Sequence, residues 1–356
     1  MYPDIITSLH FELSDKCQAS CPMCPRNSFG GAEREHIKNV EITLEQFKQW
    51  FPVDFLKQLR HVYACGNNGD PLMAKDCLEI FEYLEKNTHP DCLLDIHTNG
   101  SLRNKDWWTR LAKVMGKRGR VIFAIDGWAG EHEIYRRGTN WEKIIENAKT
   151  YIAAGGRARS DTIVFAHNED RIEDLEKYLL EIGFESVNLK PTFRFYGYEN
   201  FPVKDRKGNF EYYLKPAIGP RWNNNLPKPN FVKLVDKNEY NKMLASADID
   251  PGCWKGFNIY VNSQGHLYPC CWVGSCVDNS RYVEVQSNPE EIIRDRLAQS
   301  AYDIVDDIGM IDLNGTTIVD ALRASKWNAE LPKHFTTDPK LVCVKSCAKN
   351  FSKIIT

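Results

Sequence analysis

The sequence lacks a long hydrophobic run. No stretch reaches 18 apolar residues, so a membrane-spanning helix is not expected. The first residues, MYPDIITSLHFELSD, hold no basic segment followed by an apolar one, which argues against a secretory signal peptide. The chain also lacks an excess of charge, because 46 Lys and Arg stand against 48 Asp and Glu for a net charge of −2. That balance gives no reason to expect a nucleic-acid binder. We therefore expect a cytoplasmic protein.

Length and composition argue against a disordered chain. The 356 residues are 42% hydrophobic and 12% aromatic, whereas disordered chains have few aromatic residues and a high net charge. A chain of this length can bury a large core, as one large domain or a large and a small one. Its twelve cysteines are unusual. In so large a chain without a signal peptide, they indicate metal binding or catalysis rather than disulfides.

A repeated strand–helix pattern runs through residues 1–190. Apolar, β-rich runs predict strands near 6–13, 60–65, 93–97, 121–125, 162–166 and 186–189. Helical patterns lie near 44–57, 74–87, 105–116, 141–154 and 170–182, with start signals at Thr43, Asn104 and Asn140 and stop signals at Gly155 and Gly183. Such alternation implies an α/β fold with a parallel sheet, either an open doubly wound sheet or a partial barrel. In both, chemistry gathers at the carboxyl ends of the strands.

The pattern changes after about residue 190. Residues 191–240 hold eleven aromatic residues at irregular spacing, with nine basic residues against five acidic ones. Residues 253–347 hold six cysteines around a strand-like piece at 257–262 and a turn at Gly265. We therefore expect three parts: a core over 1–190, an aromatic-rich connecting and covering segment over 191–250, and a small cysteine-rich domain over 251–356.

The first cysteine group is Cys17-x3-Cys21-x2-Cys24, directly after the first predicted strand. Three thiolates on one short loop leave one metal position open. Structural zinc sites normally close with four ligands, so a [4Fe–4S] cluster with one unliganded iron suits this loop better. A zinc loop completed by a distant residue, or free buried cysteines, are the alternatives.

This cysteine loop resembles that of the radical S-adenosylmethionine (SAM) enzymes, and the resemblance continues along residues 8–190. Gly66-Asn-Asn-Gly-Asp-Pro-Leu72 is similar to the family's GGEP-type loop, with Asp70 in place of the usual Glu. His97-Thr-Asn-Gly100, Ala124-Ile-Asp-Gly127 and Tyr135-Arg-Arg-Gly138 resemble later family segments, and Met23 stands where an aromatic residue is frequent. The resemblance implies a partial (β/α)6 TIM-like barrel. It also implies SAM contacts at Met23, Asn68, Gly69, Asp70, Pro71, Thr98, Asn99 and Asp126, and at Arg136 or Arg137.

The second cysteine group resembles the opening of the SPASM and twitch extensions of these enzymes. The detail is Cys253-x11-Gly265-x4-Cys270, followed by Cys271, Cys276 and the tail pair Cys343-x3-Cys347. The resemblance implies one auxiliary [4Fe–4S] cluster held by Cys253, Cys270, Cys343 and Cys347, and two such clusters in all. A zinc site on the same four thiolates is the alternative, and Cys271 could replace Cys270. Cys77 and Cys92 are expected to be small buried apolar residues.

The resemblance implies an oxidoreductase or modifying enzyme that cleaves SAM reductively to a 5′-deoxyadenosyl radical, which abstracts a substrate hydrogen. An external low-potential electron donor is then required. A peptide or protein residue is the favoured substrate, to be oxidised, cross-linked or epimerised. The chain begins almost at its first strand, which leaves no room for a leader-peptide-binding domain and weakens the ribosomal-peptide reading. A sugar-like or anionic small molecule is the alternative substrate. Low-ranked candidates for a hydrogen-donating thiol are Cys276, Cys271 and Cys65.

Three rival functions follow from the same cysteines. A non-catalytic iron–sulfur protein would only carry electrons and would not cleave SAM. A zinc-binding interaction module would be colourless. A modifier of tRNA or rRNA is a further family analogy, which the acidic balance of the chain disfavours.

Overall fold

The computed structural model describes residues 2–192, 194–195, 199–219, 221–222, 236–255, 258–280 and 289–350, the side chains of residues 280 and 289–294 excepted. It divides into two compact units. Unit 1 comprises residues 1–10, 48–59 and 225–356, and unit 2 comprises residues 11–47 and 60–224. The three-part organisation expected from the sequence stays a prediction. Each unit is described by itself below.

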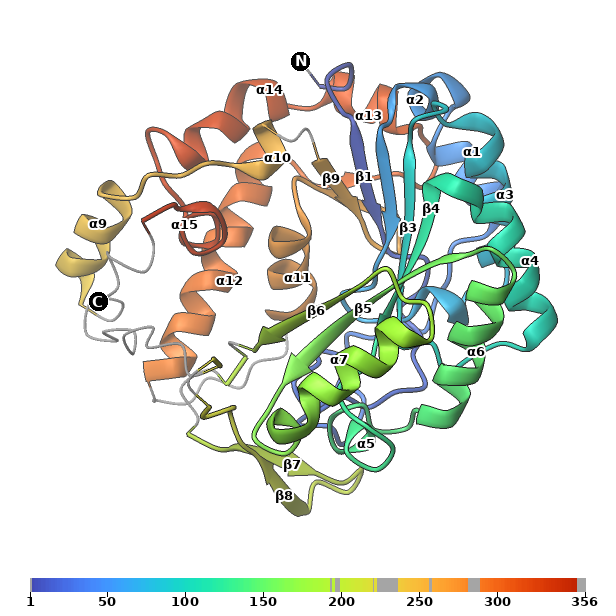
Figure 1. Cartoon of the computed structure of the whole chain (residues 1–356). Helices are drawn as coiled ribbons and strands as arrows, with labels where there is room; N and C mark the ends of the chain where they lie inside the picture. The colour runs from blue at the N-terminus through green and yellow to red at the C-terminus, as the bar shows by residue number, and fades with distance from the viewer. Residues whose placement is uncertain are drawn as a thin grey trace. The chain divides into compact units, whose positions relative to one another are not determined.

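A parallel sheet forms the centre of unit 2 (Figure 1). Its strands follow one another in chain order. They are β1 (Ser8–Phe11), of which Phe11 belongs to this unit, β2 (His61–Ala64), β3 (Leu93–Thr98), β4 (Gly119–Ala124), β5 (Arg157–Val164) and β6 (Ser186–Pro191). This is the predicted α/β fold, a sheet of six parallel strands in the order of a partial (β/α)6 barrel.

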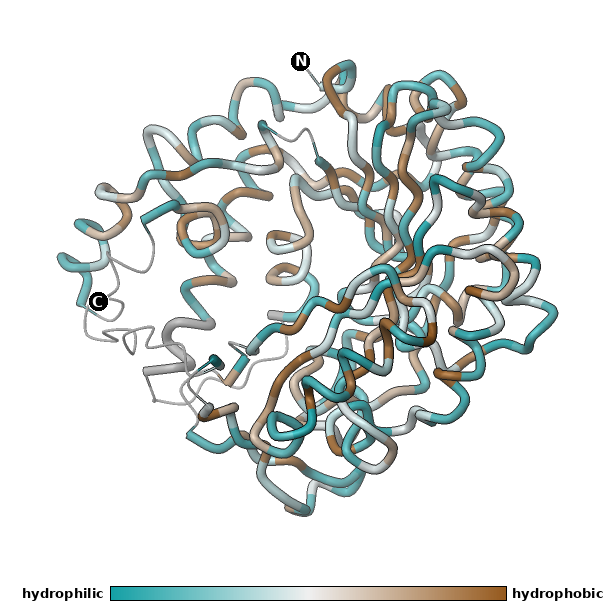
Figure 2. The backbone as a smooth tube through the Cα atoms, viewed as in Figure 1, coloured by the Kyte–Doolittle hydropathy of each residue, from teal (hydrophilic) through white to brown (hydrophobic). Residues whose placement is uncertain are grey.

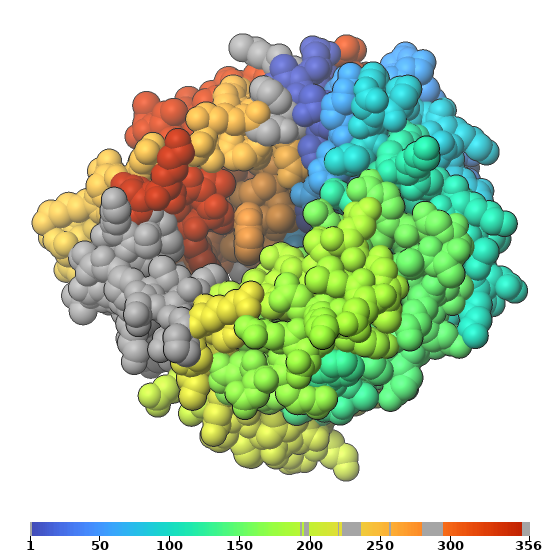
Figure 3. Space-filling model, viewed as in Figure 1, coloured from blue at the N-terminus to red at the C-terminus, as the bar shows by residue number. Residues whose placement is uncertain are grey.

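Helices connect the strands and cover one face of this sheet. They are α3 (Cys77–Asn87), α4 (Lys105–Met115), α6 (Trp141–Ala153) and α7 (Ile172–Glu181), whereas the short α5 (His132–Tyr135) lies in the connection between β4 and α6. The predicted start signals are confirmed, because the side-chain oxygens of Asn104 and Asn140 accept hydrogen bonds from the backbone N–H groups of Trp107 and Lys143. Helices α4, α6 and α7 form part of the molecular surface in Figure 3.

The core of unit 2 lies between the sheet and these helices. Trp108 of α4 stacks on Phe123 of β4 with ring centroids 5.3 Å apart, and both are fully buried. Tyr151 of α6 packs edge-on against Trp108. Figure 2 shows the corresponding hydrophobic run along β3 and β4. The predicted burial of Cys77 and Cys92 is confirmed, since both are 0% exposed.

The opposite face of the sheet, called the inner face below, is polar. Asp95 of β3 accepts hydrogen bonds from Arg120 (Nε to Oδ1, 2.8 Å), and its Oδ2 lies 2.9 Å from Nε2 of His61. Lys190 of β6 is ion-paired with Asp161 of β5, with Nζ 2.7 Å from Oδ2. The inner face therefore carries paired charges where many barrels carry aliphatic side chains.

Two local predictions are wrong, each for a physical reason. The helix expected over 44–57 is two helices, α1 (Leu44–Trp50) and α2 (Val53–Gln58), because Pro52 has no N–H and takes an extended conformation. Strand β5 begins five residues before the predicted run, since its inner-face residues are polar and give no apolar alternation. The irregular segment after residue 190 contains a hairpin, β7 (Phe201–Lys204) and β8 (Phe210–Leu214).

Unit 1 contains an antiparallel set of short strands, β9 (Asn258–Val261), β10 (His266–Tyr268) and β11 (Ile311–Asp312). The predicted turn between β9 and β10 is confirmed, with Gly265 at φ +89°. The helices are α9 (Lys237–Ala245), α10 (Gly252–Lys255), α11 (Cys271–Ser280), α12 (Pro289–Ile308), α13 (Ile318–Ala324), α14 (Trp327–Glu330) and α15 (Leu341–Cys347). Within the described ranges of the whole chain, no helix is both long and apolar enough to cross a membrane.

Candidate functional site

The first cysteine group lies on the loop that follows β1. The backbone N–H of Ser20 donates to the carbonyl of Arg137 (2.7 Å), and its hydroxyl donates to the carbonyl of Gly30 (2.8 Å). The N–H of Cys24 closes a turn on the carbonyl of Cys21 (3.0 Å). These three backbone and hydroxyl contacts within unit 2 fix the loop before any ligand is considered.

The three thiols lie within electrostatic reach of one another in a dry environment. The pKa of Cys17 is raised well above its usual range, first by burial and then by the Asp70 carboxylate and the other two thiols. Burial raises the pKa of Cys21 to about 11, although the Arg136 guanidinium opposes the shift. A metal would have to displace these protons, as it does from any cysteine ligand. In the described part of the chain, no three His, Cys, Asp or Glu side chains are grouped as a single-ion site.

The predicted GGEP-type loop lies beside the cysteine loop. The Glu12 carboxylate, 1% exposed, accepts hydrogen bonds from the backbone N–H groups of Asn68 (2.7 Å) and Gly69 (2.8 Å). The N–H of Asp70 donates to the carbonyl of Lys16 (2.9 Å) on the cysteine loop. A Cβ on Gly69 would overlap the carbonyl of Ser14, so only glycine permits this approach.

Asp70 joins that loop to the predicted Thr98-Asn99 turn. Its carboxylate accepts from the Thr98 hydroxyl (2.9 Å) and from the backbone N–H (2.8 Å) and side-chain Nδ2 (2.6 Å) of Asn99. It also accepts from the N–H of Leu72 (2.9 Å), at the start of the short 3-10 helix Pro71–Met73. Burial raises the pKa of Asp70, and these hydrogen bonds oppose the rise. The carboxylate is therefore committed to positioning the two loops.

Asn99 extends this network back to the cysteine loop. Its Oδ1 accepts from Nε2 of Gln18 (2.7 Å), and its Nδ2 lies 3.9 Å from the sulfur of Cys17. The segments after β1, β2 and β3 are thus joined by side chains at the carboxyl ends of their strands. That is the arrangement expected for a parallel sheet.

Asp126, directly after β4, forms a buried ion pair with Arg136. Its Oδ2 lies 2.5 Å from Nε of Arg136, and its Oδ1 accepts from the N–H of Ile163 (2.6 Å). The carboxylate side chain is 0% exposed. Nη1 of Arg136 lies 4.0 Å from the sulfur of Cys21, so the guanidinium reaches from the fourth strand end to the cysteine loop.

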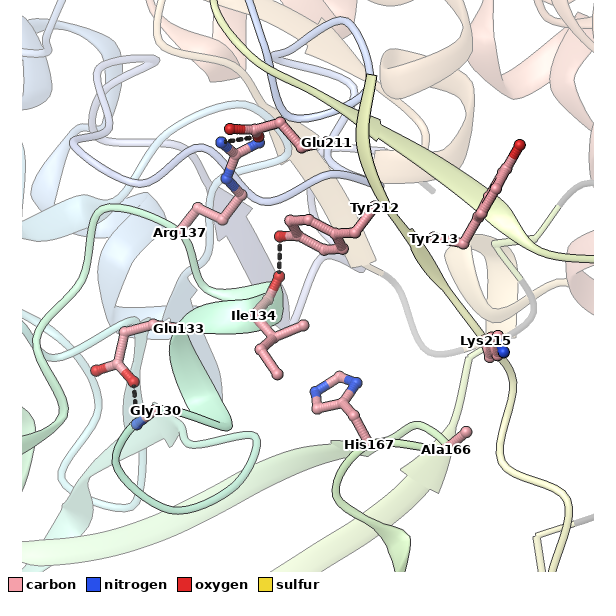
Figure 4. Close-up of a pocket in the computed structure, with 10 residues that line it drawn as sticks. All are labelled: Gly130, Glu133, Ile134, Arg137, Ala166, His167, Glu211, Tyr212, Tyr213 and Lys215. Carbon is pink, nitrogen blue, oxygen red and sulfur yellow. Dashed lines mark hydrogen bonds and ion pairs between the residues drawn. The ribbon is translucent and has the colours of Figure 1, made fainter. Parts of the chain in front are cut away.

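Arg137 has a different role from its neighbour. Its Nη1 donates to the carbonyls of Gly30 (3.1 Å) and Lys204 (2.7 Å), and its Nη2 pairs with Glu211. Figure 4 shows this pair beside Tyr212, whose hydroxyl donates to the carbonyl of Ile134 (2.6 Å). Arg137 therefore attaches hairpin β7–β8 to α5 and the cysteine loop, whereas Arg136 faces the thiols.

Hairpin β7–β8 and α5 surround the cysteine loop with apolar side chains. Met23, 4% exposed, belongs to one buried cluster whose other members are Ala19, Cys21, Tyr135, Phe165, Phe201, Val203 and Leu214. Cys17 and Cys24 pack against this cluster. The result is a low-dielectric surrounding, in which charges and radicals are shielded from water.

Two polar groups at these strand ends are suited to the amino and carboxylate groups of SAM, which the resemblance implies as a ligand. Oδ1 of Asn68 is buried and has no hydrogen-bond partner among the described residues. An unpaired buried acceptor is costly, and an ammonium group would satisfy it. Nη2 of Arg136 likewise has no partner in the described ranges, and a guanidinium suits a carboxylate. With three thiols beside them, the residues fit a cluster and SAM.

The four predicted auxiliary ligands come together within unit 1. Cys253 lies on α10, Cys270 at the start of α11, and Cys343 and Cys347 on α15. The pKa of Cys343 is raised well above its usual range, first by burial and then by the thiols of Cys270, Cys253 and Cys347. Burial raises the pKa of Cys270 to about 11, while the N–H groups of Val273 and Trp272 oppose the rise.

The three candidate donor thiols lie in different places. Cys65 directly follows β2, and burial, followed by the carboxylates of Glu12, Asp70 and Asp161, raises the pKa of its thiol to about 12. Cys276 lies on α11 in unit 1, and burial raises its pKa. Cys271 begins the same helix and is half-buried.

Sequence reasoning missed two residues that hold this site together. Glu12 carries the loop of residues 66–70, and a lone acidic residue at a strand end gives no signal for that role. His132 accepts from the N–H of Asp126 through Nδ1 (3.0 Å), and its Nε2 lies 3.1 Å from the Thr139 hydroxyl. Burial, and then Arg136, lower the pKa of His132 to about 3, so the ring stays neutral.

Comparison with known proteins agrees with this geometry. Residues 11–181 match the model of the radical SAM superfamily. Streptococcus suis SuiB shares the fold, with a TM-score of 0.50 and 15% sequence identity over 81% of this chain and 64% of SuiB. The chain thus spans less than two thirds of the length of SuiB.

Two other solved structures are similar at lower scores. One is anSMEcpe with bound AdoMet, with a TM-score of 0.47 and 17% sequence identity over 84% of this chain and 83% of that one. The other is BtrN in complex with AdoMet and 2-DOIA, with a TM-score of 0.42 and 12% sequence identity over 96% of this chain and 93% of that one. No curated protein matches the sequence. Residues 11–181 thus carry a radical SAM domain, and members of that superfamily use a [4Fe–4S] cluster and SAM.

Proposed function

We propose that this radical SAM enzyme binds its catalytic [4Fe–4S] cluster through Cys17, Cys21 and Cys24 and cleaves SAM reductively. When bound, the cluster and SAM supply a 5′-deoxyadenosyl radical that removes a hydrogen atom from a substrate C–H bond. The observation that carries the proposal is the convergence of four strand-end segments in unit 2. The cysteine loop, the loop held by Asp70, the Thr98-Asn99 turn and the Asp126–Arg136 pair meet there.

Each segment has a distinct task in this proposal. Arg136 receives the carboxylate of SAM, since its guanidinium faces Cys21 and retains an unpartnered nitrogen in the described structure. Asn68 receives the amino group through its unpaired Oδ1. Asp70 positions the loops, and Met23 supplies apolar contact. Arg137 stays outside this set because its donors are spent on hairpin β7–β8 and Gly30.

A peptide or protein residue remains the proposed substrate. Beside hairpin β7–β8 lies a cavity of about 810 Å³, lined partly by Ile134, Tyr212 and Tyr213, which has room for several residues of an extended chain (Figure 4). Tyr213 is 55% exposed and offers an aromatic surface. A small polar molecule is the second candidate, favoured by the charged inner face below the strand ends.

The auxiliary cluster is proposed on Cys253, Cys270, Cys343 and Cys347. The four thiols lie within electrostatic reach of one another around the start of α11, where backbone N–H groups favour a thiolate. Such a cluster would take up an electron from the substrate, and an external donor would reduce the catalytic cluster.

Anaerobic reconstitution followed by reduction with dithionite tests the proposal. The protein should contain about eight irons and release 5′-deoxyadenosine from SAM. The Cys17/Cys21/Cys24→Ala triple variant should hold about four irons and release none. A protein that holds eight irons but leaves SAM intact would instead be an electron carrier, and a colourless zinc protein would contradict both readings.

A further inference from the structure

The inner face of unit 2 holds an arginine without a carboxylate partner. Arg159 lies on β5, and its only hydrogen bond in the described structure runs from Nε to the Ser186 hydroxyl (2.9 Å). The other inner-face cations are compensated, Arg120 by Asp95 and Lys190 by Asp161. The guanidinium of Arg159 is thus one uncompensated positive charge in a partly buried position.

This arginine lines a cavity. A space of about 290 Å³ is bordered on the inner face by His97, Arg120, Arg159, Asp161, Ser186 and Asn188, among others. Burial lowers the pKa of His97, so that ring adds no charge at neutral pH. A cavity of this size accepts a small molecule or one side chain rather than a folded segment.

The cavity is lined by residues of β3 to β6, and the proposed SAM site lies beyond the carboxyl ends of β1 to β4. The strand register places His97, Ile122, Arg159 and Ser186 in one row across β3 to β6. His97 directly precedes Thr98, which binds Asp70. At about 4.8 Å between neighbouring strands, Arg159 is about 10 Å from His97 along this row. A molecule held by Arg159 would therefore have to span about 10 Å across the strands to reach His97, the residue before Thr98.

We propose that Arg159 binds a carboxylate group of the substrate. A guanidinium with both terminal nitrogens unused forms two parallel hydrogen bonds to a carboxylate. One surplus charge matches a monoanionic carboxylate, whereas a phosphate carries about −1.5 to −2 and would need further cations. The role in substrate binding depends on the proposed function, but the anion site itself does not.

Binding of acetate to the reconstituted protein tests the site. The unfolding midpoint is followed against sodium acetate and, separately, inorganic phosphate, with sodium chloride holding the ionic strength constant. Wild type should bind acetate. The acetate affinity of Arg159→Gln should be at least about tenfold lower, because a hydrogen-bonded charge is lost. Arg159→Lys should fall between them, since it keeps the charge but not the paired geometry.

Arg157→Gln is the matched control. Arg157 lies two residues earlier on β5, and its guanidinium is already paired with Glu185 (Nε to Oε1, 2.6 Å). This variant should bind acetate as wild type does. The unfolding midpoint without added anion shows whether the Arg159→Gln variant is folded. If acetate stabilises wild type and Arg159→Gln equally, or if phosphate binds more tightly than acetate through Arg159, the proposal is overturned.

A pair of capped tripeptides, one with a central glutamate and one with glutamine, separates the two sources of the carboxylate. If wild type binds the glutamate peptide more tightly than free acetate, and Arg159→Gln loses this preference, the site binds an acidic residue of a peptide. Arg159-dependent binding of acetate with no peptide preference assigns it to a small carboxylic acid. Acetate binding without SAM cleavage would contradict the proposed function alone, and cleavage without acetate binding would contradict only this inference.

Discussion

Replacing Asp126 by Asn removes the negative charge that holds Arg136 at the cysteine loop. Asn has the same shape, but it offers one acceptor oxygen in place of the two that now bind Arg136 (2.5 Å) and the N–H of Ile163 (2.6 Å). Removing one partner of a buried ion pair costs about 3–5 kcal/mol. Because one hydrogen bond can persist and the Arg136 side chain is 19% exposed, we expect a loss near the low end, about 3 kcal/mol of unfolding free energy.

Anaerobic urea unfolding, followed by tryptophan fluorescence, measures this loss. Asp54→Asn is the control, since Asp54 is 96% exposed and pairs with Lys57 at 3.4 Å. An exposed pair of this kind contributes less than about 0.5 kcal/mol. A loss for Asp126→Asn no larger than that for Asp54→Asn would refute the claim that this pair fixes the site.

The same variant should weaken SAM binding about tenfold, because Arg136 loses the carboxylate that orients it toward Cys21. Equilibrium dialysis with labelled SAM on the oxidised, reconstituted protein measures the affinity without turnover. Asp54→Asn should bind SAM as wild type does. Unchanged affinity in Asp126→Asn would show that Arg136 needs no orienting partner.

Three further predictions test other parts of the molecule. Gly69→Ala should abolish 5′-deoxyadenosine release, since its Cβ would overlap the Ser14 carbonyl and displace the loop; normal release would contradict that packing. Although burial opposes it, hydrogen bonds from neighbours including Arg120 lower the pKa of Asp95 to about 2. A lowered pKa of a carboxyl group stabilises the folded protein above pH 4. The free energy of unfolding should therefore fall by about 2.5 kcal/mol as the pH falls from 4 through 2. Unfolding measured across this pH range should show no such loss in Asp95→Asn. Cys253→Ala should halve the iron from about eight to about four by colorimetric assay; unchanged iron would remove it from the ligand set.

The sequence was sufficient to predict features that depend on local spacing. Helix starts at Asn104 and Asn140 follow from one side chain and the next turn of backbone, so they appear where predicted. The alternation of strands and helices implied the parallel sheet, and its order then brings successive strand ends together. For this reason Asp70 could be predicted to lie near Thr98 and Asn99, which are 28 and 29 residues further along the chain.

Features that depend on long-range pairing could not be predicted. Arg136 and Arg137 are adjacent and chemically identical, and only the position of Glu211 on β8 separates their roles. The start of strand β5 was not predicted because its inner face carries Arg159 and Asp161 instead of apolar residues. Glu12 gave no signal, since its partners are backbone N–H groups more than fifty residues away.

Each of the two cysteine groups lies within one unit. Cys17, Cys21 and Cys24 and the side chains around them belong to residues 11–47 and 60–224, whereas the four auxiliary candidates lie between residues 253 and 347 of unit 1. The contacts described above for the strand-end site all lie within unit 2. SAM binding to the oxidised protein should accordingly survive Cys253→Ala, while completion of the reaction on substrate should not. That separation between binding and turnover would distinguish an auxiliary redox cluster from a zinc site that only stabilises the fold.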